Sequence, residues 1–112
     1  MCIDRVLMNT RNKTIDLIKK TANEFLPQAE VLLFGSRARN ENSTDSDYDV
    51  LIITDSILSP KEKITIRTNI RKSLLKIGIR SDILIQGKKE VDQKKKLPGH
   101  IVRKIMREAI TL

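Results

Sequence analysis

Short apolar runs alternate with segments of helical periodicity along this chain, and the alternation restricts the fold to a few classes. Residues 30–35 form one such run, and residues 47–54 and 79–87 contain two more with the length and composition of strands. Apolar residues recur at helical spacing within residues 11–26 and 59–78. We therefore predict an α/β or α+β fold in which helices pack on one sheet.

Both predicted helices carry signals at their ends. The first ends before Pro27, which cannot continue a helix. The second begins at SPKE, where Ser59 can cap, Pro60 suits the first helical position and Glu62 can complete a capping box. Gly78 is a natural C-terminal stop for this helix.

The last quarter of the sequence gives weaker signals. Residues 88–96, KKEVDQKKK, are so rich in charge that we predict a solvated loop, although its lysines could also guide an acidic partner. Residues 109–112, AITL, are predicted to form a short final strand. A last helix is predicted to begin near Pro98 and to bury three apolar residues, Ile101, Ile105 and Met106.

The composition is that of one globular domain. With 112 residues, 39% of them hydrophobic and 32% charged, the chain can form a single core, so we predict one domain over residues 1–112. No apolar run approaches the ~20 residues of a membrane span, and the N-terminus does not resemble a signal peptide. The lone Cys2 rules out an internal disulfide. Together these features predict a cytoplasmic protein that does not contact a membrane.

The charge of the chain predicts an anionic ligand. Lys and Arg number 22 against 14 Asp and Glu, and the net charge of +8 suits a nucleotide, RNA or an acidic protein surface. Proteins that bind single strands without sequence preference stack bases on aromatic side chains, and the chain has only Phe25, Phe34 and Tyr48. Direct nucleic-acid binding is therefore disfavoured relative to a site that handles phosphate.

The stretch FGSRARNENSTDSDYDVLII, residues 34–53, carries most of the candidate chemistry. Gly35 and Ser36 follow the first strand, where free backbone N–H groups at the start of a helix can cradle a phosphate. Gly35 has no Cβ to block a ligand, and Ser36 adds a hydroxyl donor. Arg37 and Arg39 supply positive charge nearby.

Three aspartates are candidates for a metal site. Asp47 and Asp49 lie two residues apart on one predicted strand, so both side chains point the same way. Two carboxylates this close raise each other's pKa unless a cation lies between them. Asp82 on a neighbouring strand can complete a site for two Mg²⁺ ions, which would suit phosphoryl or nucleotidyl transfer. Each feature alone is also explained by a solvated loop end or a strand start, but their combination and order favour the site.

Three other residues have competing interpretations. Arg39 either contacts phosphate or braces the loop against Asp45. Tyr48 lies between the two aspartates and points to the opposite side of the strand, so we predict that it packs in the core. His100 stands alone near a helix start, and we do not predict that it binds a metal.

The stretch GSRARNENSTDSDYDVLI resembles the signature of the minimal nucleotidyltransferases (MNT domains), a small branch of the DNA polymerase beta-like superfamily. Their pattern is Gly-Ser-x-Ala-Arg-Gly, a short loop, and Ser-Asp-x-Asp before an apolar strand. SDILI is similar to their third-carboxylate strand, and HIVRKIMREAITL to their closing helix and strand. The sequence departs at Asn40, where the family usually has glycine, and asparagine is the residue that next best tolerates positive φ. The matching positions are Gly35, Ser36, Ala38, Arg39, Ser46, Asp47, Asp49 and Asp82.

The resemblance implies a polymerase beta-like fold, with a small mixed sheet flanked by helices, and a reaction that uses ATP and Mg²⁺, as two ions. It implies that Asp47 and Asp49 bind the metals. Asp82 would hold the catalytic metal and help to deprotonate the acceptor hydroxyl. The residues that would bind the nucleotide are Gly35, Ser36 and Arg39.

Free-standing members of this family resemble the antitoxin of two-gene toxin–antitoxin systems, whose partner is a helical HEPN-domain RNase. The resemblance implies transfer of AMP from ATP to a tyrosine of that partner, and a homo- or hetero-oligomer is compatible with it. Alternatives are an antitoxin that acts by binding alone, a nucleotidyltransferase for a small molecule such as an aminoglycoside, and a nucleic-acid binder. The three carboxylates favour an enzyme, because a binding module has no need of clustered like charges.

Overall fold

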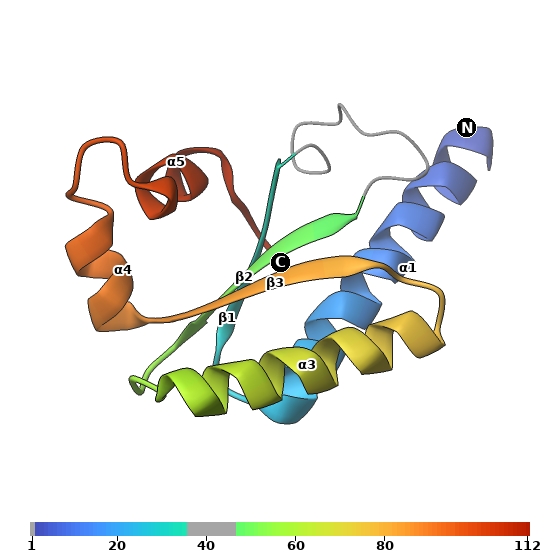
Figure 1. Ribbon diagram of the computed structural model, residues 1–112. Coiled ribbons are helices and arrows are strands. Elements are labelled where there is room, and N and C mark those ends of the chain that lie inside the picture. Colours follow the sequence, from blue (N-terminus) through green and yellow to red (C-terminus); the bar gives the residue numbers. More distant parts are fainter. Residues whose placement is uncertain (1, 36–46) are drawn as a thin grey trace.

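The computed structural model describes residues 2–35 and 47–112, with side chains from residue 13 onward. The sheet has the strand order β3-β2-β1-β4. Strands β2 and β3 are parallel, whereas β1 is antiparallel to both β2 and β4, so the predicted mixed sheet flanked by helices is confirmed (Figure 1). The elements in chain order are α1 (Cys2–Phe25), β1 (Glu30–Phe34), β2 (Tyr48–Thr54), α3 (Pro60–Lys76), β3 (Ser81–Gly87), α4 (Lys88–Lys94), α5 (Ile101–Glu108) and β4 (Ile110–Thr111).

Helices cover both faces of this sheet and create two cores. On one face α1 and α3 contribute buried residues that include Ile18 and Leu74. On the other face α4 and α5 contribute residues that include Val91 and Ile105. The two helix pairs therefore lie on opposite sides of the strands (Figure 1).

The central strand β2 serves both cores through the alternation of its side chains. Val50 and Ile52 lie in the core beneath α1 and α3. Leu51 and Ile53 lie in the core beneath α4 and α5. All four are at most 5% exposed, which accounts for the near-continuous apolar run in this part of the sequence.

The end signals of α3 are confirmed in the structure. Ser59 is the N-cap and its side chain accepts a hydrogen bond from the N–H of Glu62, while the side chain of Glu62 accepts one from the N–H of Ser59. Gly78 follows the helix in the left-handed region, with φ +81°. In the described part of the chain, no helix is both long enough and apolar enough to cross a membrane.

The prediction of a solvated loop over residues 88–96 is wrong, because α4 occupies Lys88–Lys94. Glu90 accepts a hydrogen bond from the N–H of Gly87, at 2.9 Å, and so satisfies a free donor at the start of the helix. Val91 is the one apolar residue of this segment and is buried. A single apolar residue leaves no periodicity to detect, which is why the sequence did not indicate a helix.

The buried face of α5 also differs from the prediction. Ile105 is buried and Met106 packs against the same core, but Ile101 is 61% exposed. Val102 takes the buried position instead, at 1% exposure. His100 is the N-cap, and its Nδ1 accepts a hydrogen bond from the N–H of Val102 at 3.1 Å, which satisfies a free donor at the start of the helix. The predicted final strand is confirmed as β4.

Candidate active site

The parallel pairing of β2 and β3 places two of the candidate aspartates side by side. Asp49 and Asp82 are register partners in this pairing, and Asp49 is also the register partner of Phe34 across the antiparallel pair β1–β2. Side chains at facing positions of neighbouring strands point to the same side of the sheet. Both carboxylates therefore lie on one face, as the alternation of residues predicts.

This face is the one that α4 and α5 cover in part. Leu51 and Leu84 follow Asp49 and Asp82 by two residues, and both belong to the core that includes α4 and α5. At the start of the strands the side chain of Asp49 is half-buried and that of Asp82 is exposed. The carboxylates thus stand at the edge of an apolar core, on the solvent-accessible part of the face.

Gly35 forms the turn that borders Asp49. Its φ is +75°, a conformation that side chains disfavour, and a Cβ at this position would overlap the Oδ2 atom of Asp49. Glycine is therefore required twice, by the backbone conformation and by the space that the carboxylate occupies. The sequence predicted that the backbone at Gly35 lies close to a bound phosphate. In the structure, the carboxylate of Asp49 is an anionic group that lies close to this backbone.

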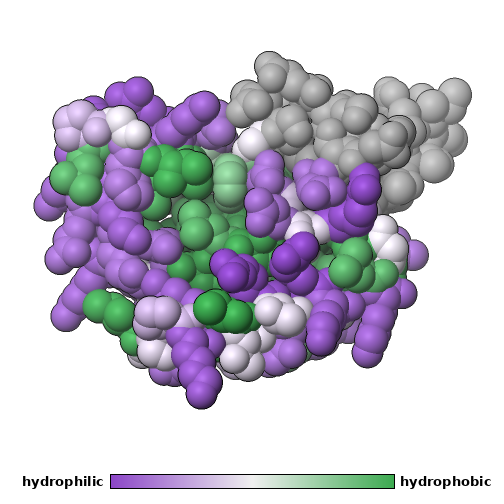
Figure 2. Space-filling model, viewed as in Figure 1, coloured by the Kyte–Doolittle hydropathy of each residue, from purple (hydrophilic) through white to green (hydrophobic). Residues whose placement is uncertain are grey.

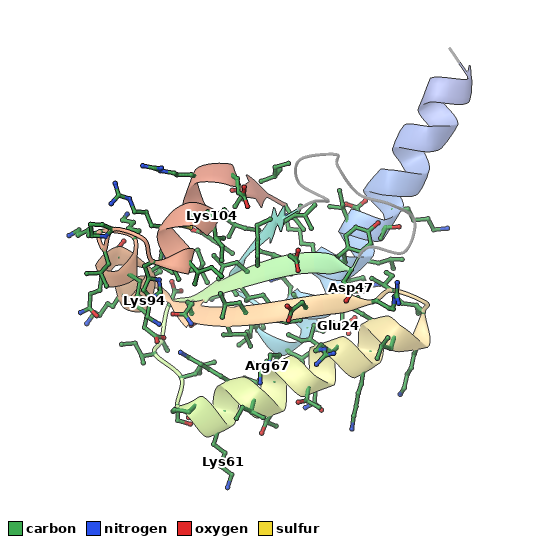
Figure 3. All side chains as sticks on the ribbon, turned by 45° about the horizontal axis from the view of Figure 1, so that its top comes forward. Glu24, Asp47, Lys61, Arg67, Lys94 and Lys104 are labelled. Carbon is green, nitrogen blue, oxygen red and sulfur yellow. The ribbon has the colours of Figure 1, made fainter. Side chains whose placement is uncertain are left out.

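Asp47 precedes β2 and forms an ion pair with Arg80, whose Nε lies 3.3 Å from Oδ1 of Asp47. Both side chains are about half exposed. The N–H of Tyr48 donates to the carbonyl of Arg80 at 3.0 Å and holds the starts of the two strands together. Figure 3 shows Asp47 at this end of β2. The sequence analysis did not single out Arg80. Arg80 lies two residues before Asp82, just as Asp47 lies two residues before Asp49.

The structure brings two of the three candidate ligands to facing positions and holds the third against a cation. Within residues 2–35 and 47–112, no three or more His, Cys, Asp or Glu residues are grouped closely enough to hold a metal ion. The donor set nevertheless suits Mg²⁺, which prefers carboxylate oxygen and shares its coordination sphere with water and phosphate. A three-carboxylate site that includes Asp47 stays a prediction.

The remaining candidates divide into two groups. Tyr48 packs against the core beneath α1 and α3, as predicted, and His100 caps α5. The candidates that lie outside the described residues are Ser36, Arg37, Ala38, Arg39, Asn40, Asp45 and Ser46.

Comparison with protein families shows to which family the chain belongs. The model of the nucleotidyltransferase domain family matches residues 15–112, which include all four strands, Gly35 and the three aspartates. The chain belongs to this family. The match supports membership of the polymerase beta-like superfamily, to which the sequence pattern is similar. No match to a curated protein was found.

Nucleotidyl transfer requires that the reacting phosphorus is held in line with its acceptor and that charge on the phosphate oxygens is stabilised as the bond to the leaving group breaks. The fold of this nucleotidyltransferase provides an accessible pair of carboxylates on rigid, paired strands, next to a glycine turn. Arg80 adds a cation at the same end of the sheet. Positioning on strands is the feature that such chemistry requires, because misplacement by about 1 Å can cost a hundredfold in rate.

Proposed function

We propose that this nucleotidyltransferase transfers AMP from ATP to a tyrosine hydroxyl of a partner protein, a HEPN-type RNase toxin, and acts as its antitoxin. The observation that carries the proposal is the facing position of Asp49 and Asp82 on the accessible part of the sheet face. Membership of the nucleotidyltransferase family supports nucleotidyl transfer in general. The resemblance to MNT domains supports the finer assignments, which are AMP as the transferred group, tyrosine as the acceptor and a toxin as the partner.

In this proposal the aspartates hold two Mg²⁺ ions. Asp49 and Asp82 would supply oxygen ligands from neighbouring strands, and Asp47 would be the third ligand in place of its ion pair with Arg80. Mg²⁺ bound at these oxygens would offset the negative charge that builds up on the phosphate oxygens. Gly35, together with Ser36 and Arg39 from the sequence that follows it, would bind the triphosphate.

The transfer itself forms one bond and breaks one. The phenolic oxygen of the acceptor forms a bond to the α-phosphorus of ATP, and the bond from that phosphorus to pyrophosphate breaks. Because a tyrosine hydroxyl has a pKa of about 10, its proton must be removed for attack at neutral pH. Asp82 is the exposed carboxylate of the pair and is the group to which we assign this proton.

The test is intact-mass spectrometry of the partner after co-expression with the wild-type enzyme or with Asp82→Asn, a nearly isosteric change. We expect a gain of one or more AMP units with the wild-type enzyme and none with Asp82→Asn. Asp92→Asn is the matched control, because Asp92 is an exposed aspartate of α4 that pairs with Lys95 at the end of the same helix. A partner that is inhibited but unmodified by the wild-type enzyme would support the binding-only alternative.

A second measurement addresses the nucleotide alone. Calorimetric titration with ATP should show tighter binding with Mg²⁺ than without it, and Asp49→Asn should remove the difference. Equal affinity under both conditions would contradict the metal site irrespective of the acceptor.

A further inference from the structure

Helix α5 has two opposed faces. Val102 and Ile105 are buried against the sheet. Arg103, Lys104 and Arg107 lie on the other side of the helix, at the spacing of three and four residues that places side chains on one face. We call these three residues the α5 basic face.

The cations of the α5 basic face differ from the nearby lysines of α4 in their ion pairs. On α4, Lys88 pairs with Asp55 at 2.8 Å, and Lys95 at its end pairs with Asp92 at 3.2 Å. In the parts of the chain that the structure describes, no ion pair involves a residue of the α5 basic face. Among the described residues, Lys88, Lys94 and Lys95 thus each have a carboxylate partner, whereas the three cations of the α5 basic face remain available to an anionic ligand.

A hollow of about 410 Å³ lies beside this face and is lined by its three cations together with His100 and Ile101. Ile101 is 61% exposed, and Leu97 in the preceding turn is 51% exposed. In Figure 2 the part of the surface over α4 and α5 is mainly hydrophilic, with isolated hydrophobic groups. The surface therefore offers cations and aliphatic side chains together.

We propose that the α5 basic face, with Leu97 and Ile101, is the surface on which an acidic protein acceptor docks. This inference rests on the proposed transfer to a protein. The acceptor surface that fits carries Asp or Glu residues beside exposed aliphatic side chains. Because α5 packs on the same side of the sheet as Asp49 and Asp82, a protein bound there lies on the side of the sheet that carries the two carboxylates.

The chemistry of the surface favours a protein over the other polyanions. A nucleic-acid backbone has phosphates but no aliphatic groups to cover Leu97 and Ile101, and the chain has only three aromatic residues for base stacking. An anionic membrane would accept the cations. However, the apolar face of α5 is packed on the sheet, so the helix cannot insert it into lipid.

The experiment compares three labelled probes by fluorescence anisotropy or co-sedimentation. They are a short helical peptide with Glu and Leu on adjacent faces, an oligouridine of similar length, and phosphatidylserine vesicles. The test variant is Arg103→Gln/Lys104→Gln/Arg107→Gln. The control is Lys61→Gln/Arg71→Gln/Lys72→Gln, which removes the same charge from exposed positions of α3. Figure 3 shows Lys61 and Lys104 on opposite sides of the sheet.

We expect the test variant to bind the peptide about tenfold more weakly, because it loses three exposed charge pairs with the peptide. The control variant should bind the peptide as the wild type does. Ile101→Ser should weaken peptide binding and leave oligouridine binding unchanged. Equal losses in the test and control variants would overturn the proposal, since net charge alone would then account for binding. The proposal would also be overturned if the wild type did not bind the peptide. The same holds if the test variant lost binding only to oligouridine or to the vesicles.

Titration with Mg²⁺ and ATP separates this proposal from the proposed function. The test variant should bind the nucleotide as the wild type does, because none of its three residues is assigned to the nucleotide site. Failure of the peptide test with normal nucleotide binding would overturn the docking surface alone. Failure of metal-dependent nucleotide binding in the wild type would overturn the enzyme and leave the peptide result standing.

Discussion

The carboxylate of Asp49 lies against the turn at Gly35, so that a methyl group at residue 35 would overlap its Oδ2 atom. The antiparallel pairing of β1 with β2 produces this contact, because Phe34 and Asp49 are register partners. The glycine turn and the carboxylate are therefore parts of one geometric unit, and a change in either one must affect the other.

We first predict that Gly35→Ala displaces Asp49 and abolishes Mg²⁺-dependent ATP binding in calorimetry. It should also lower the free energy of unfolding by at least the ~1–2 kcal/mol that a side chain costs in the left-handed region. Gly78→Ala is the matched control, because Gly78 has φ +81° but no atom lies within 4 Å of the place that its Cβ would take. That variant should lose similar stability and keep its nucleotide binding. Loss of binding in both variants would show that the effect is one of general stability.

The ion pair between Asp47 and Arg80 gives a second prediction. If Asp47 also binds a metal, Arg80 competes with that metal, so Arg80→Gln should tighten Mn²⁺ binding in the absence of nucleotide. Exposed ion pairs contribute roughly 0.2–1 kcal/mol, which corresponds to an increase in affinity of up to about fivefold. Electron paramagnetic resonance of free Mn²⁺ measures the change. Arg71→Gln, on the exposed side of α3, should have no effect, and an unchanged affinity in Arg80→Gln would argue against Asp47 as a ligand.

A third prediction concerns the pH dependence of stability. Burial alone would raise the pKa of the Glu90 carboxyl. The hydrogen bonds from Lys63 and the N–H of Gly87, together with the charges of Lys63 and Lys94, outweigh burial and lower the pKa from its usual 4.5. A lowered pKa means that Glu90 stabilises the fold above about pH 4.5 and that this contribution is lost as the pH falls through the folded-state value. In thermal unfolding, Glu90→Gln should therefore be less stable than the wild type at neutral pH and show a shallower decline in acid.

The control for this prediction is Asp92→Asn. Asp92 forms an exposed pair with Lys95, whereas Lys63 and Glu90 are each only 20% exposed and lie 2.8 Å apart. We expect the control to change the free energy of unfolding by less than about 0.5 kcal/mol. An acid decline that is equally steep in Glu90→Gln and in the wild type would contradict the assignment.

The hydroxyl of Ser81 is the subject of a fourth prediction. Among the described residues it is the one buried side-chain polar atom without a hydrogen-bond partner. Because an unpaired buried hydroxyl destabilises the folded state, Ser81→Ala should raise the free energy of unfolding, by up to about 1 kcal/mol in urea titrations. Ser73→Ala, at a half-buried position of α3, is the comparison. A loss of stability in Ser81→Ala would mean that the hydroxyl has a partner.

The fold was predictable from local signals where side-chain alternation and caps agree. The capping box at Ser59 and Glu62 and the two faces of β2 follow from sequence spacing alone. Helix α4 was not predictable, because its stability comes from contacts remote in sequence. Glu90 is held by Lys63 from α3, 27 residues away, and a charged segment with one apolar residue gives no local indication of such a contact.

The candidate site was predictable in its residue types and less so in its arrangement. The spacing of Asp47 and Asp49 indicated a shared face, but only the register of the parallel strands shows that Asp49 faces Asp82. The same register brings Arg80 to Asp47, a partner that the sequence did not indicate. The roles of Ser36 and Arg39 stay predictions.

The central position of β2 has a consequence for the motions of the protein. Its backbone is hydrogen-bonded to β1 on one side and to β3 on the other, so its amide protons should exchange with solvent only when the whole domain unfolds. Helices α4 and α5 lie outside the sheet and bury three residues, Val91, Val102 and Ile105, so we expect them to open in smaller, more frequent fluctuations. The strand that carries Asp49 should then keep its place while the helices beside it loosen and re-form.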